Sequence, residues 1–199
     1  MNDKYRNFRD LADHEVDGVD YRIRTRSAAA TLILAPHGGG IEPGTSELAE
    51  AIAGDDHSFY LFEGLKASGN SDLHITSSNF DEPTCRAMVT QADHVVAIHG
   101  EERDDAVVFI GGLDQGCIER LSASLASAGF VIKGPDKPHL KGHTQVNVCN
   151  CGRSGAGVQL EITDGLRRTF FRALSPRAER QHTTPAFLRL VGAVREALF

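Results

Sequence analysis

Thr31–Glu42 reads TLILAPHGGGIE, and this stretch indicates both the fold class and a candidate site. Its first six residues, Thr31–Pro36, form a short run rich in leucine and β-branched side chains, which is typical of a buried strand. His37 follows this run, and three glycines follow the histidine. Because glycine adopts positive φ angles without steric cost, the chain can turn sharply there. The stretch therefore predicts a strand that ends on a histidine and a tight loop.

Outward from this stretch, apolar runs alternate with amphipathic segments. Further strands are predicted at Ser58–Glu63, Leu73–Ser77, His94–Ile98, Ala106–Ile110, Phe130–Lys133, Val146–Cys149 and Gly157–Ile162. Helices are predicted at Thr45–Ala53 with Thr45 or Ser46 as N-cap, Glu82–Ala92, Asp114 to about Ala128, Leu166–Leu174 and Pro185–Leu198. This alternation indicates an α/β fold with a mixed, mostly parallel central sheet flanked by helices.

Length and composition limit the class of protein. The 199 residues suit a single domain over residues 1–199. The formal net charge of −6 argues against a nucleic-acid partner, which usually requires a basic face. No apolar run reaches the roughly 18 residues of a membrane helix, and the polar first twenty residues show no secretory signal. We therefore expect a cytoplasmic protein with no membrane partner and with reduced cysteines.

Three predicted strands end on side chains with metal or acid–base chemistry, namely His37, His99 and Glu161. In open α/β sheets, sites form outside the carboxyl ends of the strands. If these strands run parallel, the three side chains meet at one edge of the sheet. The glycine loop also lets Glu42, five residues after His37, fold back towards the same point. We expect His37, Glu42 and His99 to surround one metal ion.

Two histidines and one glutamate are a known ligand set for catalytic zinc. A divalent ion with a single carboxylate ligand keeps a net positive charge, which lowers the pKa of a bound water. A second carboxylate outside the ligand set is then needed to take a proton from that water, and Glu161 suits this role. We therefore expect one Zn²⁺ per chain.

Other interpretations of the HGGG segment stay open at this point. His37 could be a turn residue, or the glycine-rich loop could bind an anion at the start of a helix. The loop lacks the sequence of a P-loop, and the chain has no G-x-S-x-G segment of the kind that carries an esterase nucleophile. His94 lies five residues before His99, so on a strand it faces the opposite way. His74 could border the site.

Five segments together resemble the poly-γ-glutamate hydrolase family, which has bacteriophage and bacterial members. They are HGGGIEPGTSE, HITSSNFDEP, VVAIHG, VVFIGG and GVQLEI, within about residues 15–175. The resemblance implies a zinc carboxypeptidase-like, peptidase-like fold and cleavage of γ-glutamyl amide bonds. It also implies that His37, Glu42 and His99 bind zinc, and that Glu161 is the general base.

The resemblance suggests further site residues. Asn79 and Arg86 lie in the family-like stretch SSNFDEPTCR and are candidates for substrate binding. The family pattern implies an arginine near Cys151, but the segment NVCNCGRSG departs from this pattern, and Arg153 is the residue that could substitute. The candidates for an arginine that helps zinc to stabilise the oxyanion are Arg86, Arg103, Arg153 and Arg167.

An arginine-rich stretch, Arg167–Arg180, is a second basic feature. Arg167 is a candidate for substrate binding. If the stretch is helical, Arg168 and Arg172 share a face and could guide the α-carboxylates of an anionic polymer. An ordinary solvated helix face is the alternative.

The sequence therefore favours a zinc-dependent hydrolase that cleaves poly-γ-glutamate. We expect a monomer. Its substrate would be an anionic γ-glutamyl polymer or a small γ-glutamyl or N-acyl compound. Cell lysis could release the protein from the cytoplasm. One alternative is a zinc deacylase of a small N-acyl amino acid, similar to succinylglutamate desuccinylase. Another is a non-catalytic, phage-derived zinc-binding protein, although such a protein would not need Glu161 as a base.

Overall fold

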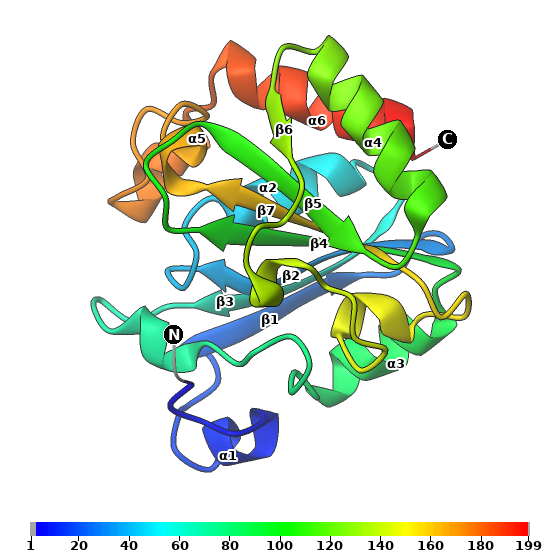
Figure 1. The fold of residues 1–199 in the computed structure, drawn as a ribbon. Helices are drawn as coiled ribbons and strands as arrows, with labels where there is room; N and C mark the ends of the chain where they lie inside the picture. The colour runs from blue at the N-terminus through cyan, green and yellow to red at the C-terminus, as the bar shows by residue number, and fades with distance from the viewer. Residues whose placement is uncertain (1–2, 199) are drawn as a thin grey trace.

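Seven strands form one sheet in the part of the chain that the computed structural model describes, residues 3–198 (Figure 1). Their order across the sheet is β1-β3-β2-β4-β7-β5-β6. Their bounds are β1 Tyr21–Arg26, β2 Thr31–Gly39, β3 Ser58–Gly64, β4 His94–Glu101, β5 Val107–Gly112, β6 Val131–Lys133 and β7 Val158–Thr163. β3, β2, β4 and β7 run parallel to one another. β1 and β5 pair antiparallel with β3 and β7, and β6 is parallel to β5. The predicted mixed, mostly parallel sheet is therefore confirmed.

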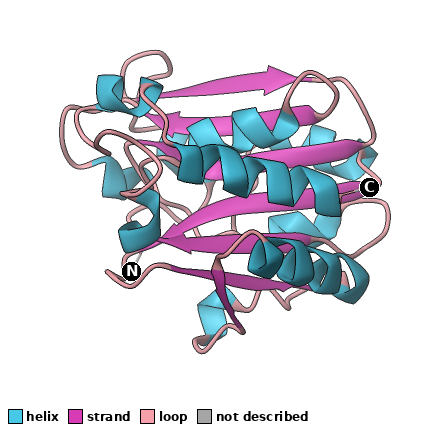
Figure 2. Cartoon of the chain, turned by 90° about the horizontal axis from the view of Figure 1, so that it is seen from above, coloured by secondary structure: helices cyan, strands magenta, loops and turns pink. Residues whose placement is uncertain are grey.

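Helices cover both faces of this sheet (Figures 1 and 2). α2 (Thr45–Ala53), α4 (Gln115–Ser127) and α6 (Pro185–Ala197) lie on one face, and α1 (Phe8–Ala12) and α3 (Pro83–Gln91) lie on the other. Among the described residues, no helix has the length and apolar character needed to cross a membrane.

The strands contribute alternate side chains to two separate cores. In β2, Ile33 and Ala35 pack with α2, α4 and α6, whereas Leu32 and Leu34 pack with α1 and α3. This follows from the two-residue period of a strand, whose successive side chains point to opposite faces. A strand buried on both sides needs apolar residues at nearly every position, as the TLILA run provides.

Two of the predicted strands are wrong. Leu73–Ser77 follows a 3₁₀ turn at Asn70–Leu73 and pairs with no strand, and Val146–Cys149 overlaps a 3₁₀ turn at Val148–Cys151. In the second case the side chain of Asn147 accepts a hydrogen bond from the backbone N–H of Cys149, and such local bonds compete with strand pairing. β1 was not among the predicted strands. It is an edge strand in which arginines alternate with other residues, so it lacks the apolar run of a buried strand.

The helix predicted at Leu166–Leu174 is also wrong, because α5 covers only Asp164–Arg167. Arg168 pairs with Asp104 and Asp164. Arg172 pairs with Glu179. These two arginines therefore do not share a helix face, and each is held by nearby carboxylates instead. The N-cap of α2 is Gly44, not Thr45 or Ser46.

Candidate metal centre and cleft

The carboxyl ends of β2, β4 and β7 bring the predicted site residues together. The three strands are parallel neighbours, and His99 lies directly opposite Glu161 in the register of β4 and β7. β2 continues past Pro36 to Gly39, with a register shift between Ala35 and Gly38. His37 therefore lies at a bulge within the strand rather than after it. His37, His99 and Glu161 are all buried.

The glycine loop folds Glu42 back towards His37. The backbone N–H of Glu42 donates to the carbonyl oxygen of His37 at 2.9 Å. Gly39 has a φ angle of +67°, and a Cβ atom at this position would lie 2.5 Å from the carbonyl oxygen of Gly64. Only glycine fits both the angle and the space, so the turn depends on it.

Three side chains form a cluster that could hold a metal ion, namely His37, Glu42 and His99. The Nδ1 atoms of His37 and His99 lie 3.2 Å apart. Glu42 Oε1 lies 3.0 Å from Nδ1 of His37, and Oε2 lies 3.7 Å from Nδ1 of His99. Tetrahedral zinc with bonds of about 2.0–2.1 Å separates its ligand atoms by about 3.3 Å. The donor types and spacings therefore fit such an ion.

Backbone groups orient His37 and Glu42, and a side-chain hydroxyl contacts His99. Nε2 of His37 lies 2.8 Å from the carbonyl oxygen of Ile75, so Nε2 carries the proton and Nδ1 offers its lone pair to the cluster. Glu42 Oε2 accepts a hydrogen bond of 2.8 Å from the backbone N–H of Gly100. Nε2 of His99 lies 3.4 Å from Oγ of Ser77. Such outer contacts are typical of metal ligands, whose orientation they fix.

The charges in the cluster shift two pKa values in opposite directions. Burial raises the pKa of Glu42, but its interactions with His37 and His99 outweigh burial and hold that pKa well below its usual range. Burial lowers the pKa of His99, but Glu161 and Glu42 attract the proton and raise that pKa overall. The cluster thus keeps a carboxylate ionised between two imidazoles, which suits a cation.

Glu161 lies beside this cluster without belonging to it. Its side chain is buried, and this burial raises its pKa to about 7 despite the opposing charge of His99. Nε2 of Gln159 donates to its Oε1 at 2.8 Å. Among the side chains that the structure describes, no other group donates to this carboxylate, so Oε2 remains available to a ligand in the cleft.

The cluster opens into a cleft of about 720 Å³. Its walls include residues from several loops, among them Ser77, Arg103, Lys137, His143, Thr144 and Asn147. His74, which the sequence suggested as a residue that could border the site, also lines the cleft. The centroids of the His74 and His37 rings lie 4.0 Å apart. Asp3 holds Nδ1 of His74 at 2.7 Å, a contact across 71 residues that no local pattern indicates.

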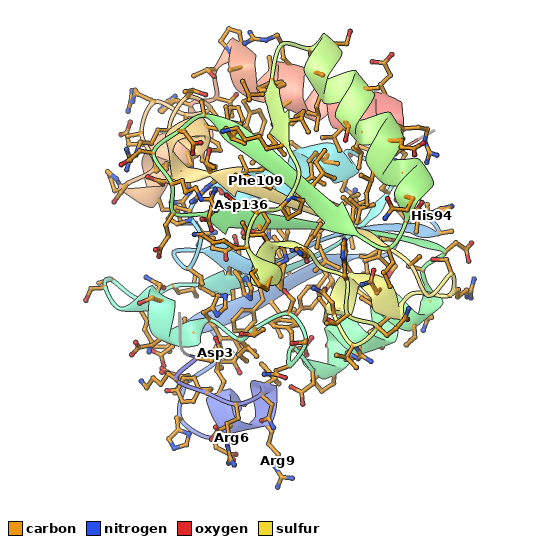
Figure 3. The ribbon with its side chains drawn as sticks, viewed as in Figure 1. Asp3, Arg6, Arg9, His94, Phe109 and Asp136 are labelled. Carbon is orange, nitrogen blue, oxygen red and sulfur yellow. The ribbon has the colours of Figure 1, made fainter. Side chains whose placement is uncertain are left out.

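The structure does not bring Arg153 to the cleft. Arg153 pairs with Asp93, immediately before the start of β4, whereas His99 lies near the end of that strand. Figure 3 shows His94, the first residue of β4, at the opposite end of the strands from Asp136, the partner of Arg103 in the cleft wall. Arg153 is therefore too far from the cluster to stabilise an oxyanion there.

Asn79 and Arg86 also lie outside the cleft lining, Asn79 on an exposed turn and Arg86 on α3. Arg167 does line the cleft, but its guanidinium donates to the carbonyl oxygens of Pro43, Glu101 and Ile162. These carbonyls belong to the three segments that carry Glu42, His99 and Glu161. Arg167 thus joins the three segments of the site.

The comparisons with known proteins agree with this geometry. The sequence profile of the poly-gamma-glutamate hydrolase family matches residues 5–193. The chain belongs to this family. The resemblance seen in the sequence motifs is therefore confirmed, and family membership supports an enzyme that hydrolyses amide bonds.

Individual members of the poly-gamma-glutamate hydrolase family match over most of the chain. The UPF0714 protein YndL of Bacillus subtilis (strain 168) is 41% identical over 172 residues, which make up 85% of this chain and 67% of YndL. The structure of a bacteriophage poly-gamma-glutamate hydrolase superposes with a TM-score of 0.95 at 35% identity and covers 99% of this chain and 97% of its own. A structure of YndL described as zinc-free superposes with a TM-score of 0.91 at 36% identity, over 99% and 98% of the two chains.

Proposed function

We propose that this protein is a zinc-dependent hydrolase that cleaves the γ-glutamyl amide bonds of poly-γ-glutamate, in one domain spanning residues 1–199. The observation that carries the proposal is the cluster of His37, Glu42 and His99 at the floor of a cleft, in a chain of this family. The zinc-free state described for the YndL structure indicates that zinc is relevant to that relative. One Zn²⁺ per chain is the proposed cofactor.

His37 and His99 would hold the ion through Nδ1, and Glu42 would hold it through its carboxylate. A zinc ion at this position supplies positive charge that lowers the pKa of water and polarises a carbonyl group. The three ligands carry one negative charge in total, so a divalent ion would leave the site positive. Arg167 and the backbone of Gly100 and Ile75 keep the ligand-bearing segments in place.

Glu161 acts as the proposed proton carrier. Its Oε2 accepts a proton from the attacking water and returns this proton to the nitrogen of the leaving amine, so the carboxylate is regenerated in each cycle. A structural zinc site would instead be closed by four protein ligands. Within the described residues three side chains converge, with an additional carboxylate beside them, and this supports catalysis over a purely structural site.

An anionic polymer suits the cleft wall. The side chain of Lys137 is about half exposed and pairs with the buried Glu101, and Arg103 pairs with Glu101 and Asp136. Each residue of a γ-linked polyglutamate chain carries a free α-carboxylate, which the half-exposed ammonium side chain of Lys137 would attract.

The experiment that tests the proposal compares two polymers. Purified protein loaded with zinc is incubated with γ-linked and with α-linked polyglutamate of equal length, and chain length is followed by gel-permeation chromatography. We expect only the γ-linked polymer to shorten. Cleavage of the α-linked polymer alone would contradict the substrate assignment, and inertness towards both would favour the N-acyl deacylase.

A further inference from the structure

Gln159 is a buried amide whose hydrogen bonds all have defined directions. It lies on β7 two residues before Glu161, so both side chains point to the same face of the sheet, and it is 1% exposed. Its Nε2 donates to Oε1 of Glu161 at 2.8 Å and to the carbonyl oxygen of Leu140 at 3.1 Å. Its Oε1 accepts from Nδ2 of Asn147 at 2.9 Å. The amide therefore links the base to the loops of the cleft wall.

The direction of this chain of bonds follows from its two backbone ends. The orientation of an amide side chain has to be inferred from its partners. The N–H of Cys149 can only donate, and it bonds Oδ1 of Asn147 at 3.1 Å. Nδ2 of Asn147 must then face Oε1 of Gln159. The carbonyl oxygen of Leu140 can only accept, so it fixes Nε2 of Gln159 on the side of Glu161.

The packing around Gln159 also prevents the amide from moving aside. Gly142 has a φ angle of +60°, and a Cβ atom there would lie 2.6 Å from Oε1 of Gln159. Nδ2 of Asn150 in turn holds the carbonyl oxygens of Gly142 and Thr144 at 2.6 and 2.9 Å. The loop that contacts the amide is thus itself fastened to the 3₁₀ turn at Val148–Cys151.

We propose that Asn147 and Gln159 form a one-directional relay that positions Glu161 and selects the oxygen that carries the proton. This inference rests on the proposed function, in which Glu161 is the general base. Oε1 of Glu161 accepts a hydrogen bond from Gln159. Because a hydroxyl oxygen of a carboxylic acid is a weaker acceptor than its carbonyl oxygen, this bond favours protonation of Oε2 over Oε1. Oε2 therefore takes the proton as the O–H bond of water breaks, and Oε2 releases it as the N–H bond of the leaving amine forms. Gln159 and Asn147 are positioning residues that do not touch the substrate.

Two variants test the relay. Gln159→Met keeps the length of the side chain and removes both of its donor hydrogens. Asn147→Asp keeps the shape of residue 147 but replaces its donor with an acceptor, so Oε1 of Gln159 loses its hydrogen bond and the amide loses the contact that orients it towards Glu161. The matched control is Thr163→Val, which removes buried hydrogen bonds to the backbone of Asp105 and Val107 on the same face of β7, without contacting Glu161.

The kinetic readout separates positioning from general destabilisation. In zinc-loaded protein we expect kcat on γ-polyglutamate to fall about 10–100-fold in both variants, with KM and zinc content unchanged. Thr163→Val should lose stability but keep its kcat. An equal loss of kcat in Thr163→Val and Gln159→Met would overturn the proposal, because the effect would then come from lost stability alone.

A structural readout decides the proposal even if the polymer is not the substrate. Crystal structures of wild type, Gln159→Met and Asn147→Asp should show the Glu161 carboxylate rotated away from its wild-type orientation in both variants. An unchanged carboxylate in both would overturn the relay. A third outcome separates the two proposals. If wild type cleaves no polymer but the Glu161 carboxylate is rotated in both variants, the relay is supported and only the proposed function is contradicted. If Gln159→Met does not fold, Asn147→Asp alone gives the same decision, because its shape is nearly unchanged.

Discussion

His37 donates from Nε2 to the backbone carbonyl oxygen of Ile75 at 2.8 Å, and this bond determines which nitrogen faces the cluster. With Nε2 protonated, Nδ1 is the atom that meets Glu42 and His99. The ring therefore does not need to rotate or exchange its proton between nitrogens before it binds a cation, and less free energy is lost in ordering the site.

Replacing either histidine of the cluster should remove the metal. We expect His37→Ala and His99→Ala to retain less than a tenth of the zinc bound by wild type, since each loses one of three protein ligands. The control is His94→Ala, an exposed residue on the same strand as His99 that is remote from the cluster. Elemental analysis after dialysis gives the ratio of zinc to protein. Full zinc retention in both cluster variants would rule out this site.

Glu161→Gln should abolish most of the catalysis without removing zinc. The amide keeps the shape of the side chain and can still accept the hydrogen bond from Gln159, but it cannot take a proton from water. A positioned base contributes typically about 10²–10⁴-fold, so we expect a loss of about 3–5 kcal/mol in transition-state stabilisation. KM should change little. The assay is kcat measured at known zinc stoichiometry. A near-normal kcat would assign the base to another group, and loss of zinc would make Glu161 a ligand.

The same substitution should change how stability depends on pH in metal-free protein. The pKa of Glu161 rises from 4.5 to about 7 on folding, chiefly through burial. Between these values the folded protein binds more protons than the unfolded chain, so wild type loses stability as pH rises from about 4.5 to about 7, and the loss levels off above that pH. Glu161→Gln lacks this loss. Its advantage over wild type should therefore be about 2–3 kcal/mol larger at pH 8 than at pH 5.

Urea unfolding in the presence of a chelator, at both pH values, measures this difference. Metal has to be absent because a cation beside Glu161 would favour its charged form. A constant difference between the two proteins from pH 5 to pH 8 would show that Glu161 titrates alike in the folded and unfolded states.

Arg167 should matter for the integrity of the site, whereas Arg153 should not. Arg167→Lys keeps the charge but cannot reach three carbonyl oxygens that a planar guanidinium bonds at once. We expect its free energy of unfolding to fall by about 2–4 kcal/mol. Arg153→Lys, at an exposed ion pair, should change stability by less than about 0.5 kcal/mol and leave kcat intact. Equal effects of the two substitutions would contradict the role given to Arg167.

The sequence predicted the parts of this site that depend on local pattern. A buried strand followed by a histidine and glycines is recognisable in TLILAPHGGG, and the parallel arrangement of strand ends then brings His37, His99 and Glu161 together. Arg153 was misplaced because its position depends on Asp93, sixty residues away, and not on its neighbours.

The relay to Glu161 was missed for a related reason. Val146–Cys149 has the composition of a strand, and a strand would not bring Asn147 into its bond with Gln159. The side chain of Asn147 instead bonds the backbone two residues on and caps a 3₁₀ turn, which aims its amide at β7. Local side-chain bonding here prevails over strand propensity, and only the three-dimensional structure shows it.

The central claim, a zinc-dependent γ-polyglutamate hydrolase, is tested most directly by removing and restoring the metal in one activity assay. The rate at which γ-polyglutamate shortens is measured for zinc-loaded protein, for the same protein after chelation and dialysis, and after addition of one equivalent of Zn²⁺. We predict rapid shortening, then a loss of at least about a hundredfold, then recovery. Shortening at an unchanged rate by the metal-free protein would contradict the account.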